Sequence, residues 1–332
     1  MQIIRRLETA AGNLFKLKKN RGFCHLYSGQ EACAVGIRAS MRPEDAVISG
    51  YRVHGWAYLM GVTPSGILAE LTGRSDGCSR GKGGSMHMYA KNFYGGNGIV
   101  GAQVPIGVGV ALAGKYLNIN SVCFTLYGDG AANQGQVYEA FNMAKLLNVP
   151  AIFVCENNGL ELDTSLTRSS ANATYYTQGD TIPGIRADGM DVLTVQEVSR
   201  FAIDFCLRGN GPIILELTTY RYGGHYISDP GTSYRTRVEV QAIRQTRDPI
   251  MSFKEKILSS KIASDDELKV IDSEAKKEIE TASANAKIDV EIDLNELTTD
   301  IYANFTKERI RGITPWQTYR HKSSGRIYLK EP

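Results

Sequence analysis

The clearest pattern in this chain is a set of short, nearly continuous apolar runs, each followed by polar residues. Runs at Val122–Tyr127, Ala151–Cys155 and Ile213–Leu217 have the length and residue types of strands rather than helices. Uninterrupted apolar runs are typical of parallel strands that are covered on both faces. We therefore predict an α/β protein with three layers and a mainly parallel sheet.

A helix is predicted between the first two of these strands. In Gln134–Leu147, apolar residues recur at helical spacing, so strand, helix and strand form a right-handed βαβ unit. The polar residues then follow the carboxyl ends of the strands, where open α/β sheets bind their ligands. We expect the functional site at that edge of the sheet.

The two ends of the chain are both predicted to be helical. Residues 1–21 are basic, as in a transit peptide, but the apolar spacing from Ile4 to Leu17 predicts an amphipathic helix of the folded protein. After Arg237 the chain becomes more charged, and Ser264–Glu267 forms a capping box. We predict that 1–240 carries the site and that 241–332 is a helical C-terminal region of the same domain.

Composition excludes several classes of protein. The net charge of +3, from 38 basic and 35 acidic residues, lacks the basic excess of a nucleic-acid binder. The longest apolar run, Val104–Gly114, is too short to span a membrane. The six cysteines form no CxxC pair, and Cys123 and Cys155 lie in apolar runs, which indicates buried thiols.

The glycines concentrate between Gly77 and Gly114, where they serve either tight turns or a surface that lines a ligand. Gly96, Gly98 and Gly101 match the dinucleotide motif GxGxxG. However, the preceding Lys91–Tyr94 does not read as a buried strand, and no acidic residue follows before Gly128 to bind a ribose. A dinucleotide dehydrogenase is therefore not supported.

A different cofactor fits the two strand ends better. Asp129 lies between two glycines after the first strand, and Asn158 follows the second strand, 29 residues later. Carboxylate and amide oxygens suit Mg²⁺, whose remaining ligands are then diphosphate oxygens and water. This paired arrangement is the signature of enzymes that use thiamine diphosphate with Mg²⁺.

Further motifs narrow the family, and they stand at Arg21–His25, Gly29–Ala32, Tyr51–Gly55, Gly81–Met88 and Tyr220–Pro230. Together they closely resemble the alpha subunits of the mitochondrial pyruvate dehydrogenase component, over almost the whole chain. The resemblance implies oxidative decarboxylation of pyruvate in the mitochondrial matrix, with the acetyl group passing to lipoamide of an acyltransferase to supply acetyl-CoA. It also implies a heterotetramer of two alpha and two beta subunits, in which the beta subunit supplies a catalytic glutamate.

The resemblance also assigns roles to individual residues. Asp129 and Asn158 would bind Mg²⁺ through their side chains, and Leu160 through its carbonyl group. The cofactor would contact Tyr51, Arg52, His225, Gly130, Ala131, Gly98 and Val100. His25 and His225 would take part in catalysis, whereas His54 and His87 are expected to be structural.

Some positions depart from the family's pattern. Glu161 and Asp163 place negative charge near the anionic cofactor, which predicts weaker binding of thiamine diphosphate. Tyr226 stands where mammalian members carry their main regulatory phosphoserine, while Ser165 and Ser233 match two other phosphorylation positions, so control by a kinase and phosphatase is expected in part. A branched-chain 2-oxo acid dehydrogenase alpha subunit and a non-catalytic paralogue remain the alternatives.

Overall fold

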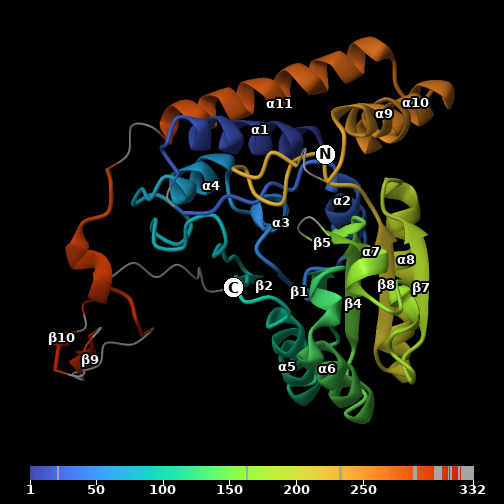
Figure 1. The fold of residues 1–332 in the computed structure, drawn as a ribbon, viewed down its shortest axis with the longest axis horizontal. Helices are drawn as coiled ribbons and strands as arrows, with labels where there is room; N and C mark the ends of the chain where they lie inside the picture. The colour runs from blue at the N-terminus through green and yellow to red at the C-terminus, as the bar shows by residue number, and fades with distance from the viewer. Residues whose placement is uncertain are drawn as a thin grey trace.

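A six-stranded parallel sheet forms the middle layer of the computed structural model (Figure 1). The structure describes residues 1–20, 22–161, 164–231, 234–286, 290–302, 309–312, 314, 316–320 and 322. The order of the strands is β2-β1-β3-β4-β8-β7. Their bounds are Ala46–Ser49 for β1, Phe93–Gly96 for β2, Cys123–Gly128 for β3, Ala151–Asn157 for β4, Gly184–Asp188 for β7 and Ile213–Thr218 for β8.

The three predicted strands are confirmed as β3, β4 and β8, which lie side by side in the sheet. The predicted helix between the first two is α6 (Gly135–Leu146), so the βαβ unit is also confirmed. One detail of the sequence interpretation was wrong. Phe93 is buried and begins the short strand β2, which pairs with β1. The absence of an acidic residue after the glycines, which argues against a dinucleotide site, is unaffected.

Two helices cover one face of the sheet. Helices α5 (Gln103–Tyr116) and α6 pack beside each other, and their apolar residues meet alternate side chains of β3 and β4. The approach of α5 depends on Gly107, because a Cβ there would lie 2.0 Å from the Thr125 hydroxyl oxygen of β3. Gly107 therefore serves packing against the sheet, whereas a Cβ at Gly109 would meet no atom within 4 Å.

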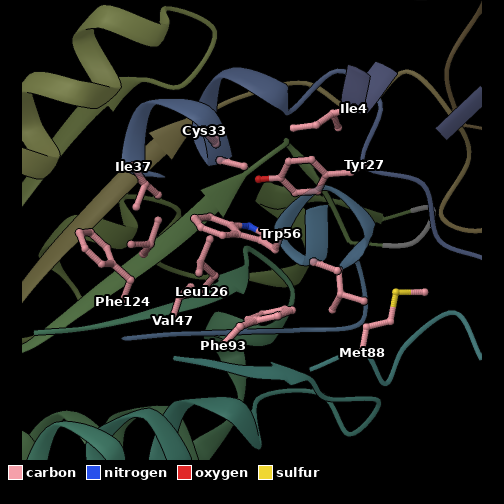
Figure 2. Close-up of a cluster of buried hydrophobic side chains, with 14 of the residues drawn as sticks. Ile4, Tyr27, Cys33, Ile37, Val47, Trp56, Met88, Phe93, Phe124 and Leu126 are labelled. Atoms are coloured by element: carbon pink, nitrogen blue, oxygen red, sulfur yellow. The ribbon is translucent and has the colours of Figure 1, made fainter. Parts of the chain in front are cut away.

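The other face of the sheet carries the larger hydrophobic core, which Figure 2 shows in part. Tyr27, Trp56 and Phe124 lie in this core, between the sheet and the helices above it. Gly36 allows two of those helices to pack closely, because a Cβ there would lie 2.6 Å from the Cβ of Val195. The helices of this layer are α1 (Gln2–Lys16), α2 (Glu31–Ser40), α3 (His54–Leu59), α4 (Pro64–Leu71) and α8 (Val192–Phe205).

The N-terminal helix belongs to the folded domain, as the apolar spacing predicts. Ile4, Leu7, Ala11 and Leu14 of α1 are all buried in the larger core. Helix α11 (Asp265–Asn285) lies along α1 (Figure 1). The predicted capping box of Ser264 and Glu267 is present at the start of α11. The C-terminal region thus packs on the helices that cover the sheet.

Two more helices, α9 (Arg237–Arg247) and α10 (Pro249–Ser259), precede α11. The chain then forms a strand pair that the sequence did not predict, β9 (Arg309–Arg311) with β10 (Thr318–Arg320). The division into residues 1–240 and 241–332 stays a prediction. The remaining elements are short: β5 (Leu160–Glu161), β6 (Thr164–Ser165), α7 (Leu166–Ser169), η1 (Ala131–Asn133), η2 (Tyr175–Thr177), η3 (Cys206–Asn210) and η4 (Leu294–Thr298).

Two expectations from composition agree with the fold. Cys123 and Cys155 are buried free thiols on β3 and β4. Within the described ranges, every helix is too short or too polar to cross a lipid bilayer.

Candidate active site

A cleft opens at the carboxyl ends of the central strands. Because β1, β3, β4 and β8 are parallel, the segments that follow them meet at this one edge. Most of the residues that the sequence assigns to the cofactor line the cleft, and these are Tyr51, Arg52, Val100, Asp129, Gly130, Ala131, Asn158 and His225. Residues more than 170 positions apart in the sequence are therefore brought together, as predicted.

The two predicted metal ligands come from neighbouring strands. Gly128 at the end of β3 is in register with Glu156 of β4, so Asp129 and Asn158 leave the sheet side by side. Both line the cleft. The Asn158 side-chain oxygen is buried and accepts no hydrogen bond from any described residue. An amide oxygen placed in this way fits a hard cation such as Mg²⁺.

Other predicted residues lie beside the cleft or outside the described chain. Gly98 does not contribute to the described lining of the cleft. Leu160 pairs with Ser165 in the small sheet of β5 and β6 that follows β4. Asp163 and Ser233 lie outside the described residues.

An aromatic cluster surrounds the two predicted catalytic histidines. The His25 ring centroid lies 4.4 Å from that of Tyr51 and 5.5 Å from that of His225. Burial, reinforced by the positive charge of Arg52, lowers the pKa of His25 to about 3 and the pKa of His225 to about 4. Both imidazoles are therefore neutral at pH 7, and the Nδ1 atom of each is buried without a hydrogen-bond partner in the described chain.

Arg52 binds the backbone beside both histidines. Its Nη1 donates to the carbonyl of Leu26 at 2.9 Å, and its Nη2 donates to the carbonyl of His225 at 2.6 Å. The loop after His225 is fixed a second time, because the His225 backbone N–H donates to Asp229 Oδ2 at 2.6 Å. The backbone of His225 is thus held from both sides.

Among the polar residues of the cleft lining that the sequence analysis missed are Gln30, Glu156 and Arg221. Burial, with the nearby Arg52, lowers the pKa of Arg221 to about 10. Burial raises the pKa of Glu156 to about 7, against the opposing effects of the Tyr27 hydroxyl and Arg52. Arg221 belongs to a motif already identified at Tyr220–Pro230, so that motif was the available signal.

The glycine-rich segment wraps a buried carboxylate. Glu70 of α4 accepts backbone N–H groups from Ser79, Gly81, Gly83 and Gly84, at 2.6 to 3.2 Å. Close backbone packing around one side chain is what glycine permits. Part of the glycine concentration therefore serves an internal turn rather than a ligand surface.

A second buried polar cluster explains His54. Its Nδ1 lies 2.8 Å from Glu8 Oε2, and its Nε2 lies 2.9 Å from the hydroxyl of Ser85. All three side chains are buried, and none lines the cleft as described. His54 therefore joins α1, α3 and the glycine-rich segment, in a structural role. His87 lies near the predicted cofactor residue Gly98, since a Cβ at Gly98 would be 3.7 Å from His87 Nε2.

A metal site built from three or more His, Cys, Asp or Glu side chains does not occur in the described part of the chain. The pair at the ends of β3 and β4 differs in kind, because it combines one carboxylate with one amide oxygen. Such a pair leaves most positions of an octahedral ion to other ligands, which is how Mg²⁺ is commonly held with a phosphorylated cofactor.

The comparisons with known proteins agree with this geometry. The sequence pattern of the family described as "Dehydrogenase E1 component" matches residues 1–294. A probable mitochondrial pyruvate dehydrogenase E1 component subunit alpha of Caenorhabditis elegans is 60% identical over 95% of this chain and 79% of that protein. The type II mitochondrial subunit of Ascaris suum is 58% identical over 95% and 80%, respectively.

A third relative is somewhat less similar in sequence. The somatic mitochondrial form of the pyruvate dehydrogenase E1 alpha subunit from Homo sapiens is 55% identical over 97% of this chain and 83% of that protein. These matches confirm the family that the motifs indicate and the dependence of that family on thiamine diphosphate. The predicted α/β fold is confirmed as well. The chain belongs to the dehydrogenase E1 component family.

Proposed function

We propose that this chain is the alpha subunit of a pyruvate dehydrogenase E1 component that acts in the mitochondrial matrix. With a beta subunit it catalyses the oxidative decarboxylation of pyruvate and transfers the acetyl group to lipoamide of an acyltransferase, which supplies acetyl-CoA. The observation that carries this proposal is the cleft, where residues of the predicted cofactor set converge in a chain 55–60% identical to such subunits.

Asp129 and Asn158 hold Mg²⁺ in this proposal, and the carbonyl of Leu160 completes the protein's ligands. Two observations support the fit. The Asn158 oxygen is buried without a donor in the described chain, and β3 and β4 deliver both side chains to one edge. The backbone of Gly130 and Ala131 also lines the cleft, so a diphosphate can approach closely.

The diphosphate would be bound by Arg52, Tyr51 and His225, and we add Arg221 to this set because it is buried and lines the same cleft. Two buried arginines favour an anion, because burial strengthens electrostatic attraction. Gly98 and Val100 contact the pyrimidine ring through main-chain groups. When bound, thiamine diphosphate supplies the carbon nucleophile and the electron sink for decarboxylation.

The two histidines face the substrate in this proposal. Because the pKa values of His25 and His225 are lowered to about 3 and about 4, each ring is a neutral hydrogen-bonding group at pH 7. Neutral imidazoles can accept a proton or donate one N–H to a substrate oxygen. The aromatic cluster with Tyr51 holds the rings in place and limits access of water.

The beta subunit covers helices α5 and α6 in this proposal. These adjacent helices carry large apolar side chains that are exposed in the isolated chain, namely Ile106, Leu112, Tyr116, Tyr138, Met143 and Leu146. A contiguous exposed apolar surface is typical of an interface. The alpha chain then works in a heterotetramer of two alpha and two beta subunits, and the assembly meets the lipoyl acyltransferase core.

Control by a kinase and a phosphatase is retained in part, with Ser233 and Ser165 as the acceptor sites. Tyr226, at the main regulatory position of mammalian members, packs against Phe23 and His225. The variant Ser233→Glu should lower activity, because added negative charge disturbs this loop or repels the acidic cofactor. Unchanged turnover in Ser233→Glu, with Ser233→Ala as the control, would contradict this part of the proposal.

The proposal as a whole is tested on the chain co-expressed with a matching beta subunit. With Mg²⁺ and thiamine diphosphate present, reduction of an artificial electron acceptor is followed with pyruvate and, in parallel, with 2-oxoisovalerate. Activity with pyruvate is the expected result. Preference for the branched substrate would instead assign a branched-chain alpha subunit, and a stable but inactive complex would indicate a non-catalytic paralogue.

A further inference from the structure

A chain of buried side chains lies behind the predicted metal ligand Asn158. The Nδ2 group of Asn158 donates a hydrogen bond to Oε1 of Gln30, at 3.2 Å. Gln30 caps the start of α2, is only 2% exposed and lines the cleft. Gln30 therefore contacts the ligand from the protein side, while the ligand's own oxygen stays unbonded in the described chain.

Gln30 lines the cleft together with a buried acidic residue, Glu156, which stands two residues before Asn158. The hydroxyl of Tyr27 donates a hydrogen bond to the carboxyl group of Glu156 from the core. Glu156 and Tyr27 are both buried, so this contact is shielded from water.

The structure gives the direction of the hydrogen bond between the two amides. The Nδ2 group of Asn158 donates and Oε1 of Gln30 accepts, so the NH₂ group of Asn158 faces Gln30. This leaves the oxygen of Asn158 as the atom directed at the cleft. Without this arrangement, a half turn of the amide would present N–H groups to a cation.

We propose that Gln30 is a positioning residue that fixes the Asn158 amide with its oxygen toward the metal ion. This inference rests on the proposed function, in which Asn158 is a ligand of Mg²⁺. Gln30 does not touch the ion in this arrangement. Its effect is on the orientation of the residue that does.

The test uses Gln30→Met in the complex with the beta subunit, because methionine fills nearly the same volume and cannot hydrogen-bond in the same way. Binding of Mn²⁺, a hard divalent probe, is measured by electron paramagnetic resonance with one equivalent of thiamine diphosphate per site. The dissociation constant of Mn²⁺ should rise about tenfold or more, as for other groups that orient metal ligands. The thermal midpoint of the metal-free complex should change little.

Two further variants separate positioning from packing. Gln30→Glu keeps an acceptor for the Asn158 amide, so it should recover most of the Mn²⁺ affinity that Gln30→Met loses. Gln178→Met is the matched control, because Gln178 is 8% exposed and donates to the carbonyl of Asn172 instead. It should leave Mn²⁺ affinity unchanged.

Two results would overturn the inference, and they are distinguishable. If Gln30→Met lowers the thermal midpoint but leaves Mn²⁺ affinity at the wild-type value, Gln30 is a packing residue only. If the Asn158→Ala variant binds Mn²⁺ as tightly as the wild type does, the proposed metal site is wrong. The proposed role of Gln30 is then wrong as well. A tenfold loss confined to Gln30→Met and Asn158→Ala supports both.

Discussion

The cleft and the C-terminal helices use charged residues in opposite ways. In the cleft, Arg221 and Glu156 are buried. Burial lowers the pKa of Arg221 and raises the pKa of Glu156, which favours the uncharged form of each. On α10 and α11, Lys254 and Lys269 pair with Asp265 at the surface, where water screens them. Burying a charge costs free energy unless it is compensated, whereas a surface pair contributes little. The difference indicates that the cleft is organised for an ionic ligand and the helices for solubility and packing.

The largest effect should come from removing charge at the cleft. Asp129→Asn keeps the shape of the side chain but loses the carboxylate that neutralises Mg²⁺. We expect the affinity for Mg²⁺ with thiamine diphosphate to fall more than about 100-fold, beyond the loss typical of groups behind a ligand. The rise in thermal midpoint on adding both is the measurement. Asp265→Asn on α11 is the matched control. An equal effect of the two variants would contradict the difference between the cleft and the C-terminal helices.

A smaller effect, on the stability of the whole fold, is expected from the buried polar cluster of Glu8, His54 and Ser85. His54→Leu leaves the buried carboxyl group of Glu8 with the Tyr27 backbone N–H but without its side-chain partner, which should cost about 3 kcal/mol of unfolding free energy. Lys254→Ala, which breaks a surface pair, should cost less than about 1 kcal/mol. Urea unfolding of the full chain measures both. Similar losses for the two variants would show that burial does not set the cost here.

The pH dependence of stability should also originate at the cleft. His25 and His225 have pKa values of about 3 and about 4 in the folded chain, below the ordinary value of 6.5. At a pH between the folded and the ordinary pKa of these histidines, the unfolded chain binds more protons than the folded chain. The free energy of unfolding therefore decreases as the pH falls from about 6.5 toward 4. The slope is at most about 1.4 kcal/mol per pH unit for each histidine. Unfolding at pH 7, 6 and 5 should be flatter in a variant with both histidines changed to Gln.

The smallest effect concerns the segment after Asn158. Replacing Glu161 and Asp163 by Gln and Asn removes negative charge near the anionic cofactor. Thiamine diphosphate should then bind about two- to threefold more tightly, a modest change because salt screens charges that act from a distance. Titration of the complex with the cofactor measures this. An unchanged dissociation constant for thiamine diphosphate would show that Glu161 and Asp163 do not weaken its binding.

The sequence predicted those parts of the fold that have a local signal. The strands β3, β4 and β8 are continuous apolar runs, and α1 and α11 have clear spacing or caps. Strand β7 was missed because Gly184–Asp188 is only partly buried and contains charged residues. Its place in the sheet depends on pairing with β8 rather than on its own composition.

The same distinction applies to the site. Asp129 and Asn158 could be identified because each directly follows a recognisable strand. Gln30 could not, because its position against Asn158 depends on how α2 packs over the sheet, and the two residues are 128 positions apart. Glu156 stands just after the predicted strand Ala151–Cys155, and only the structure shows that it belongs to β4 and lines the cleft.

The strand order has a consequence for how the chain is made. Strand β8 lies between β4 and β7, although it is the last of the six to be synthesised. Until residue 218 is available, β4 has an open edge and β7 lacks its neighbour, and pairings between such distant segments form slowly. His225 follows later still. The cofactor therefore cannot serve as a template for early folding, and a nascent or newly imported chain must protect an apolar strand edge before any ligand can help it.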